Sequence, residues 1–276
     1  MVNQPTRRAV LIGGASVLSV GALGGLGAAA GVVPVPHRVR RMMQDTGPAG
    51  VIPAVPAGRV RLERVQSQAR GRQVGFWTAV PAGYGAGAGL PVCFILHGGT
   101  ATTADYTRFG FANFLTSAVR DGAPPFVLAG ADGGLSRWEG DGAGDDPPRM
   151  LREELPAWCT DRGFDASRLA AYGWSMGGYG ALRLAERNPD LLKTVAVLSP
   201  AVAAGDAAFA GAPRLVASRT GVWCGRSDPF FHVVQEFVRL IQPHPAVASW
   251  SKGAHQRGYW NRVTPAAFSL IGRGLA

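Results

Sequence analysis

The sequence predicts one α/β domain built on a mostly parallel central sheet with helices on both faces. First, short continuous apolar runs such as the one from Leu90 to Leu96 are typical of strands that are buried on both faces. Second, such runs alternate along the chain with helix-like segments, which is the order of βα units. Third, the 276 residues are 47% hydrophobic and 17% charged, a composition that excludes intrinsic disorder and can fill one large core.

The first 33 residues are predicted to be a twin-arginine (Tat-type) signal sequence. Arg7 and Arg8 precede a stretch from Ala9 to Val33 that contains seven glycines and no charge. Ala28-Ala29-Ala30 supplies an A-x-A cleavage site. The alternative is an uncleaved signal that stays as a membrane anchor, because 25 uncharged residues can span a bilayer. The expected localisation is therefore export by the Tat pathway, secreted or associated with the cell envelope.

Residues 34–58 are expected to form a Pro/Arg-rich linker, or an arm laid over the domain, because five prolines interrupt any periodic apolar face. The α/β domain is expected over residues 59–276. Alternating apolar residues predict its first two strands, from Val60 to Val65 and from Val74 to Val80, joined by a turn at residues 70–72.

The remaining elements follow in βα order. The run that ends at Leu96 predicts the third strand. Leu151, Leu155 and Trp158 lie at helical spacing and form one apolar stripe. Further strands are expected at 126–130, 169–173, 194–198, 221–224 and 246–250, and helices at 103–119, 148–160, 176–187, 230–241 and 264–274.

The formal net charge is +10, but the basic residues are dispersed. Of the 28 basic residues, 26 are arginine, and no run is longer than two. Surfaces that bind nucleic acid cluster their charge, so no nucleic-acid partner is expected. Association with an anionic cell envelope is compatible with the net charge. The oligomeric state is not predicted.

The three cysteines, Cys93, Cys159 and Cys224, lie far apart inside apolar runs. This spacing fits neither a disulfide framework nor a zinc site, so buried free thiols are expected. No metal and no cofactor are expected.

The segment from Gly173 to Gly177 reads G-x-S-x-G, with Ser175 at its centre. In a glycine-rich chain this pattern alone is weak. It nevertheless follows an apolar strand and opens a helix, which is the setting of a nucleophile elbow. The turn is expected to strain the serine backbone, and the small neighbours at 173 and 177 allow strand and helix to approach closely.

A serine hydroxyl needs a histidine to take its proton. Among His37, His97, His232, His244 and His255, the last follows the final strand and precedes the final helix, so we expect His255 to be the base, with His244 as its competitor.

The orienting acid is expected between serine and histidine in the chain, because this is the order in such hydrolases. Asp228 follows a strand directly and is preferred over Asp206, which has no strand before it. The backbone N–H groups of Met176 and Gly99, or Gly98 in place of Gly99, are expected to form the oxyanion hole.

These residues resemble the putative-esterase branch of the α/β-hydrolases, which includes esterase D (S-formylglutathione hydrolase), feruloyl esterase-like enzymes and secreted mycolyltransferases. The resemblance runs from about residue 60 to the end of the chain. It implies the same triad and oxyanion pair, and leaves the substrate open. The segments that carry it are Leu96 to Gly99, Ala131 to Gly134 with Trp138, Gly173 to Gly180, Ser199 to Ala201, Gly225 to Asp228, and Gly253 to His255 with Tyr259 and Trp260.

The loop at residues 131–147 carries five acids in a basic chain. Because it follows a strand, we expect it on the rim of the active site, where Trp138 would contact an acyl chain or a sugar. Trp174 and Tyr179, which flank Ser175, are further candidates for contacts with substrate. The alternatives are a solvated loop and a glycine-hinged lid. The spacing of the acids does not match a calcium loop.

Together these patterns predict an exported serine esterase that hydrolyses carboxylic esters through a Ser175–His255–Asp228 triad and an acyl-enzyme. Its expected partner is an ester of a small molecule, a lipid or a carbohydrate. The first alternative is an acyltransferase that moves the acyl chain to a sugar or lipid hydroxyl. A non-catalytic protein that binds the envelope is the second.

Overall fold

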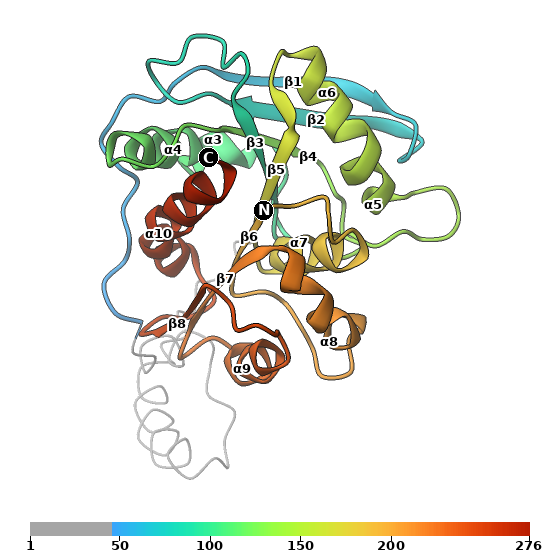
Figure 1. Ribbon diagram of the computed structural model, residues 1–276, viewed down its shortest axis with the longest axis vertical. Coiled ribbons are helices and arrows are strands. Elements are labelled where there is room, and N and C mark those ends of the chain that lie inside the picture. Colours follow the sequence, from blue (N-terminus) through green and yellow to red (C-terminus); the bar gives the residue numbers. More distant parts are fainter. Residues whose placement is uncertain (1–45) are drawn as a thin grey trace, which may run out of the picture. The chain divides into compact units, whose positions relative to one another are not determined.

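The central element is an eight-stranded sheet in the order β1-β2-β4-β3-β5-β6-β7-β8 (Figure 1). The computed structural model describes residues 46–276, except the side chains of Val216 and Ala217. Strands β1 and β2, and β2 and β4, pair antiparallel, and every other pair in the sheet is parallel, which confirms the expected mostly parallel sheet. The strands are β1 Val60–Ser67, β2 Arg72–Ala79, β3 Pro91–Leu96, β4 Val127–Ala131, β5 Asp165–Trp174, β6 Thr194–Leu198, β7 Arg219–Gly225 and β8 Val247–Ser251.

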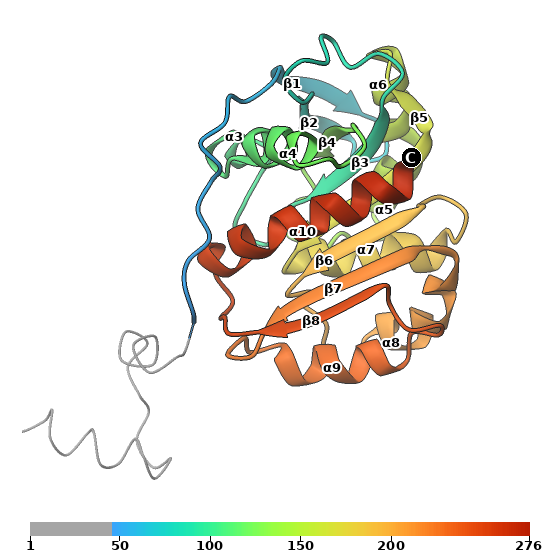
Figure 2. The ribbon, with the colours of Figure 1, turned by 60° about the vertical axis from the view of Figure 1, so that its left-hand side comes forward.

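Helices cover both faces of the sheet, as predicted (Figure 2). Each face has its own apolar core. One core contains residues of α6, α7, α8 and α9, and the other contains residues of α3, α4 and α10. The helices are α3 Asp105–Arg108, α4 Phe111–Arg120, α5 Pro147–Arg149, α6 Leu155–Asp161, α7 Met176–Arg187, α8 Ala207–Gly211, α9 Phe231–Arg239 and α10 Arg257–Leu275, with a π-helix at Met150–Glu154 and a 3₁₀-helix at Ala212–Ala217.

Two of the predicted helices are interrupted. The segment 103–119 divides into α3 and α4 at Gly110, whose φ of 75° is left-handed and ends a helix. The segment 148–160 begins as α5 and a π-turn before α6, because Pro156 has no N–H to continue a regular ladder. Its stripe is buried at Leu151 and Leu155, while Trp158 is half-buried.

Helix α10 begins at Arg257, seven residues before the predicted start at 264. Pro265 lies inside the helix, and a proline there normally breaks the helix because it removes one hydrogen bond. Burial of one helix face, at Tyr259, Val263 and Phe268, stabilises α10 across this position. Pro265 itself faces solvent.

Residues 46–58 form an extended arm over the α4 and α10 side of the domain (Figure 2). The Gly50 N–H donates to the Gly258 carbonyl of α10 at 2.7 Å, and the Asn113 side chain of α4 donates to the Val55 carbonyl at 2.8 Å. Through these contacts residues 46–58 lie as an arm against α4 and α10. The predicted signal at residues 1–33 and the rest of the linker, up to residue 45, lie outside the described residues.

The parallel register brings the carboxyl ends of five strands together, those of β3, β5, β6, β7 and β8. Gly173 of β5 lies beside Leu96 of β3, and Trp174 lies beside Leu198 of β6. On the other side, Gly225 of β7 lies beside Ser251 of β8. The loops that leave these strands therefore meet at one edge of the sheet, the usual place for a site in this architecture. No helix within residues 46–276 has the length and apolar character needed to cross a membrane.

Candidate active site

Ser175 lies on the tight turn between β5 and α7, with φ 54° and ψ −123°. This strained conformation is the one expected of the serine in such a turn. A Cβ atom on Gly173 would lie 2.2 Å from the Gly177 carbonyl oxygen, and one on Gly177 would lie 2.0 Å from that of Leu96. Glycine is therefore required at both positions for strand and helix to approach each other.

Ser175, His255 and Asp228 form one hydrogen-bonded line. The Ser175 Oγ lies 2.8 Å from His255 Nε2, and His255 Nδ1 lies 2.9 Å from Asp228 Oδ2. In this geometry the Nδ1–H donates to the carboxylate, which leaves Nε2 free to accept the serine proton. The Asp228 side chain is fully buried, whereas 23% of the His255 side chain is exposed to solvent.

Two loops held together by backbone contacts place the acid and the histidine side by side. The Ser227 N–H donates to the Gly253 carbonyl at 2.8 Å, and the other Asp228 oxygen accepts from the Phe230 N–H at 2.9 Å. A Cβ atom on Gly225 would lie 2.3 Å from the Gly253 carbonyl oxygen, so only glycine permits this approach.

Two aromatic rings that the sequence analysis did not assign hold the His255 imidazole. The centroids of the Phe230 and Trp260 rings lie 5.2 and 5.0 Å from that of His255, both edge-on. The Trp260 Nε1–H donates to Ser199 Oγ at 3.1 Å, which fixes the indole. Only the family resemblance contained a signal for Ser199 and Trp260, since both lie in its matched segments.

Met176 and Gly99 lie close together beside Ser175. As the first residue of α7, Met176 has an N–H without an intrahelical acceptor, at the positive end of the helix. A Cβ atom on Gly99 would lie 3.8 Å from Met176 Sδ, and one on Gly98 would lie 3.4 Å from the Ser175 Cβ. Gly98 therefore adjoins the serine, and Gly99 adjoins Met176, which directly follows the serine.

His97 connects the Gly98–Gly99 segment to Gly133 through its two ring nitrogens. Its Nδ1 lies 2.9 Å from the Gly98 carbonyl oxygen, and its Nε2 accepts from the Gly133 N–H at 2.9 Å. Burial lowers the pKa of His97, which is consistent with a neutral ring that donates from Nδ1.

The competing candidates lie elsewhere. Asp206 accepts two hydrogen bonds from Arg137, so its carboxylate is engaged away from His255. His244 precedes β8 and lines a hollow with Thr220 and Ile241 near the amino ends of the strands. His232 lies on α9 and stacks on Phe231, and His37 is outside the described residues.

Trp138 does not lie on the rim of the site, so that expectation is wrong. Its side chain is 2% exposed, and its Nε1–H donates to the His97 carbonyl at 3.2 Å. Gly133 and Gly180 leave the space that the indole fills, because a Cβ atom on either would lie within 2.6 Å of it. The ring is a packing element under the loop, with almost no surface for a ligand.

All five acids of the 131–147 loop have partners inside the protein, which argues against a loosely solvated loop. Asp132 accepts from the N–H groups of Gly75 and Thr103. The remaining four anchor the loop to arginines or to backbone N–H groups: Glu139 to Arg183 and Arg187, Asp141 to Ala143 and Asp145, Asp145 to Arg70 and Arg72, and Asp146 to Arg149.

Trp174 and Tyr179 flank Ser175 as expected but are largely buried, at 2% and 4% exposure. The Tyr179 hydroxyl donates to Glu139 at 3.2 Å, and the Arg137 guanidinium stacks 3.9 Å from its ring centre. Burial raises the pKa of the Tyr179 hydroxyl. Contacts of these two side chains with substrate stay predictions.

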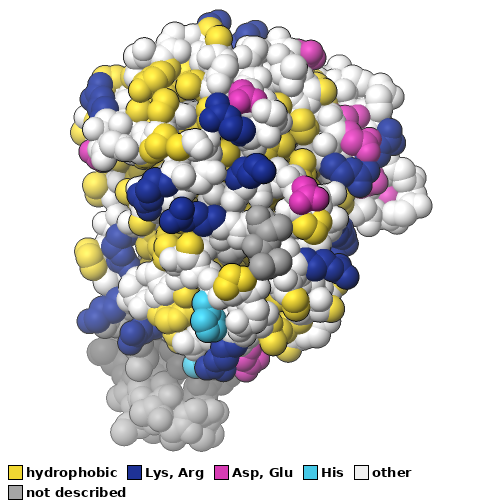
Figure 3. All heavy atoms as spheres, viewed as in Figure 1, with side chains coloured by type: hydrophobic (Ala, Val, Ile, Leu, Met, Phe, Trp, Pro, Cys, Tyr) yellow, Lys and Arg dark blue, Asp and Glu magenta, His cyan; other side chains and the backbone are white. Residues whose placement is uncertain are grey.

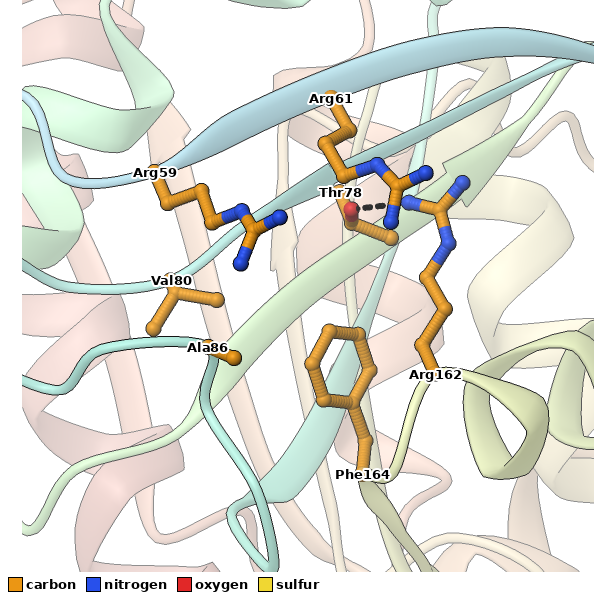
Figure 4. A pocket seen from close by; sticks show the side chains of 7 residues that line it. All are labelled: Arg59, Arg61, Thr78, Val80, Ala86, Arg162 and Phe164. Carbon is orange, nitrogen blue, oxygen red and sulfur yellow. Dashed lines mark hydrogen bonds between the residues drawn. The ribbon is translucent and has the colours of Figure 1, made fainter.

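A separate hollow lies at the other end of β5. Phe164, which lines it, directly precedes β5, whereas Ser175 directly follows the ten-residue strand. The two places are therefore roughly 30 Å apart along the strand. Three guanidinium groups surround this hollow, and that of Arg162 donates to the Thr78 hydroxyl (Figure 4). It does not belong to the candidate active site.

Charge is dispersed over the face drawn in Figure 3, where basic side chains alternate with apolar and uncharged surface. Within residues 46–276, no group of three or more His, Cys, Asp or Glu side chains is arranged to hold a metal ion. The three cysteines are buried and free, as expected, and burial raises the pKa of each thiol.

Comparisons with solved structures define the class of fold. A ferulic acid esterase is 19% identical with a TM-score of 0.69 over 78% of this chain and 97% of its own. The S-formylglutathione hydrolase of Agrobacterium tumefaciens is 18% identical with a TM-score of 0.65 over 85% and 100%. MPT51 of Mycobacterium tuberculosis is 21% identical with a TM-score of 0.60 over 80% and 100%. The domain therefore has the α/β-hydrolase fold.

The family follows from the sequence match. Residues 67–267 match the family described as Putative esterase, and the chain belongs to that family. No curated protein matches the chain. Membership supports the hydrolysis of esters as the general activity.

Proposed function

We propose that this protein is a serine esterase that cleaves carboxylic esters through an acyl-enzyme on Ser175. The observation that carries the proposal is the hydrogen-bonded line from Ser175 Oγ through His255 to Asp228, at 2.8 and 2.9 Å. These distances lie within the range over which a proton passes between nucleophile and base. The strained turn at Ser175 supports the same role.

In the first half-reaction, Ser175 Oγ attacks the ester carbonyl carbon while His255 Nε2 takes the hydroxyl proton. The Asp228 carboxylate stabilises the imidazolium through its bond to Nδ1–H. The N–H groups of Met176 and Gly99 donate to the carbonyl oxygen as it gains negative charge. The bond between carbon and the alcohol oxygen then breaks, and His255 returns the proton to the departing alkoxide.

In the second half-reaction, water attacks the acyl carbon and transfers a proton to His255. The bond to Ser175 Oγ breaks, the serine regains its proton, and the carboxylic acid leaves. An acceptor hydroxyl can replace this water, which would make the protein an acyltransferase. Hydrolysis and transfer are separated by product analysis in the presence of glycerol or a disaccharide, because only transfer yields a new ester.

The test is release of p-nitrophenol from p-nitrophenyl esters of graded chain length. Ser175→Ala is expected to lower kcat by about 10³-fold or more, because the remaining groups have no nucleophile. Ser167→Ala is the matched control, since Ser167 lies near the other end of the same strand and its hydroxyl donates to Asp165. Equal activity of Ser175→Ala and wild type would refute the proposal, as would absence of covalent labelling by a fluorophosphonate.

We also propose that residues 1–33 direct export of the folded domain by the Tat pathway. The support is the Arg7-Arg8 pair before an uncharged, glycine-rich stretch. Replacement of both arginines by lysine is expected to retain the protein inside the cell, with Arg38→Lys/Arg40→Lys as the matched control. Cell fractionation measures this, and export of the first variant would contradict the proposal.

A further inference from the structure

Arg257 lies beside the candidate active site, and no sequence pattern singled it out. Its guanidinium carbon is 5.0 Å from the ring centre of Trp174 and 5.6 Å from that of Trp260. Trp174 directly precedes Ser175, and the Trp260 ring packs against that of His255. Each of these two indoles therefore connects Arg257 to one member of the hydrogen-bonded line.

The Arg257 guanidinium has no hydrogen-bond or ion-pair partner among residues 46–276. Asp105 interacts electrostatically with Arg257. Its carboxylate is bonded instead to Arg108 at 2.6 Å and to the Thr102 N–H at 2.9 Å. The local charge of these side chains is therefore positive. Burial lowers the pKa of Arg257 to about 10, which reflects the loss of water around an uncompensated cation.

The position of Arg257 on its helix adds to this excess of positive charge. Arg257 is the first residue of α10, a 19-residue helix whose N-terminus carries partial positive charge. A cation is disfavoured there, whereas an anion is favoured. The Phe109 ring, 3.5 Å from the guanidinium carbon, offsets part of the cost through a cation–π contact but accepts no hydrogen bond.

The residue is half-buried, so part of its surface still meets solvent. An incoming anion would supply the missing acceptor without disturbing any bond that the side chain now makes. A single guanidinium matches one carboxylate, because its planar fork donates two parallel hydrogen bonds.

We propose that Arg257 binds a carboxylate carried by the substrate, so that the preferred esters bear a carboxylate next to an apolar portion that packs on Phe109 and Trp260. This inference rests on the proposed esterase function and names its substrate class. The carboxylate belongs to the acyl chain or to the alcohol, and two sets of substrates distinguish these sources.

The experiment compares esters that differ only in the charge. For the acyl side, mono-p-nitrophenyl succinate, glutarate and adipate are paired with the neutral p-nitrophenyl esters of the same chain lengths. For the alcohol side, the butanoate of 3-hydroxybenzoate is paired with that of 3-hydroxybenzamide. The full chain is expected to give a kcat/KM at least 10-fold higher for the charged member of at least one pair.

Variants identify the residue responsible. Arg257→Gln is expected to lower the ratio of charged to neutral kcat/KM by at least 10-fold, whatever its absolute activity. Arg257→Lys keeps the charge without the fork and is expected to give an intermediate ratio. Arg273→Gln is the matched control, because it removes the same charge from the exposed last turn of α10 and should leave the ratio unchanged.

A second readout does not depend on turnover. In the Ser175→Ala background, the tryptophan fluorescence of the chain is expected to change on titration with free glutarate or 3-hydroxybenzoate. The added Arg257→Gln substitution should raise the apparent Kd at least 10-fold.

The outcomes separate the two proposals. Hydrolysis of neutral esters without any preference for charged ones would overturn the role of Arg257 and leave the esterase function standing. The same is true if Arg257→Gln keeps the ratio, in which case the side chain only packs on the rings. Failure to hydrolyse any ester, together with failure of Ser175 to react with a fluorophosphonate, would instead overturn the esterase function.

Discussion

The buried Asp228 carboxylate is stabilised by hydrogen bonds to both of its oxygens. Both carboxylate oxygens are engaged, Oδ2 by His255 and Oδ1 by the Phe230 N–H, and the side chain has no exposed surface. A buried charge without partners is costly, so the acid and the ring stabilise each other's position. The same contacts select the His255 tautomer with its proton on Nδ1.

Asp228→Asn is expected to lower kcat by about 10³- to 10⁴-fold while the fold is retained, because an amide nitrogen facing Nδ1 would favour the wrong tautomer. Asp206→Asn is the control, since that acid bonds to Arg137 and is expected to change kcat by less than about 3-fold. Steady-state kinetics with a p-nitrophenyl ester measure both. A fall of less than about 10-fold for Asp228→Asn would assign the orienting role to another group.

Glu186 is a second buried acid, away from the serine. Its Oε2 lies 2.5 Å from Arg183 Nη1, but its buried Oε1 has no partner among the described residues. Burial raises the pKa of Glu186 to about 7, and the nearby arginine opposes this shift only in part.

The shift predicts how stability depends on pH. Between the ordinary pKa of 4.5 and about 7, the folded state holds a proton that the unfolded state has released. The free energy of unfolding therefore falls as pH rises through this window, by about 1–3 kcal/mol. Glu186→Gln should remove this part of the slope, whereas Glu236→Gln, on the exposed face of α9, should keep it. Urea unfolding from pH 4.5 to 8 measures the slope, and parallel curves for wild type and Glu186→Gln would contradict the assignment.

At the scale of elements, α10 connects the arm, the core and the candidate site. Its buried face packs on β5, β6 and α4, and its first turn carries Arg257 and Trp260. The Thr264 hydroxyl donates to the Trp260 carbonyl at 2.8 Å, in the turn that contains the proline. The helix therefore tolerates Pro265 because packing, rather than intrinsic propensity, stabilises it.

Pro265→Ala is expected to raise the free energy of unfolding by about 1–3 kcal/mol, because it restores a helical N–H at an exposed position. Ala266→Gly, at the neighbouring exposed position, should lower it by about 1 kcal/mol. Urea denaturation gives both values. A loss of stability in Pro265→Ala would mean that the proline is required by the local packing.

At the scale of the whole described domain, the arm at residues 46–58 covers the junction of α4 and α10. The Arg262 guanidinium of α10 bonds to the Thr46 and Pro48 carbonyls, and Gly50 pairs with Gly258. The α10 partners in these contacts, Gly258 and Arg262, lie three and seven residues after His255 in the chain. The arm thus restrains the beginning of the helix that follows the candidate base.

A chain that starts at residue 59 is expected to melt about 5–10 °C lower than one that starts at residue 46. It loses several hydrogen bonds worth about 1 kcal/mol each, and each such loss lowers the Tm of a domain of this size by about 2–4 °C. Differential scanning calorimetry of the two chains compares them directly. Equal melting temperatures would show that the arm contributes nothing to stability.

The sequence by itself determined the sheet strands, most of the helices and the order of serine, acid and histidine. These features depend on local patterns: apolar runs, glycines at a strand-to-helix turn, and single residues at strand ends. Ser175, Asp228 and His255 could be chosen because each follows a predicted strand, and parallel strands end at one edge.

Only the tertiary structure decided what depends on neighbours distant in the chain. Trp138 was expected on the rim but fills a space left by Gly133 and Gly180, which no local pattern reveals. Helix α10 extends through Pro265 because α4 and the sheet bury its other face. Arg257 became a candidate only when the fold placed it among aromatic rings without an acceptor, since burial and hydrogen-bond partners arise from packing rather than from sequence spacing.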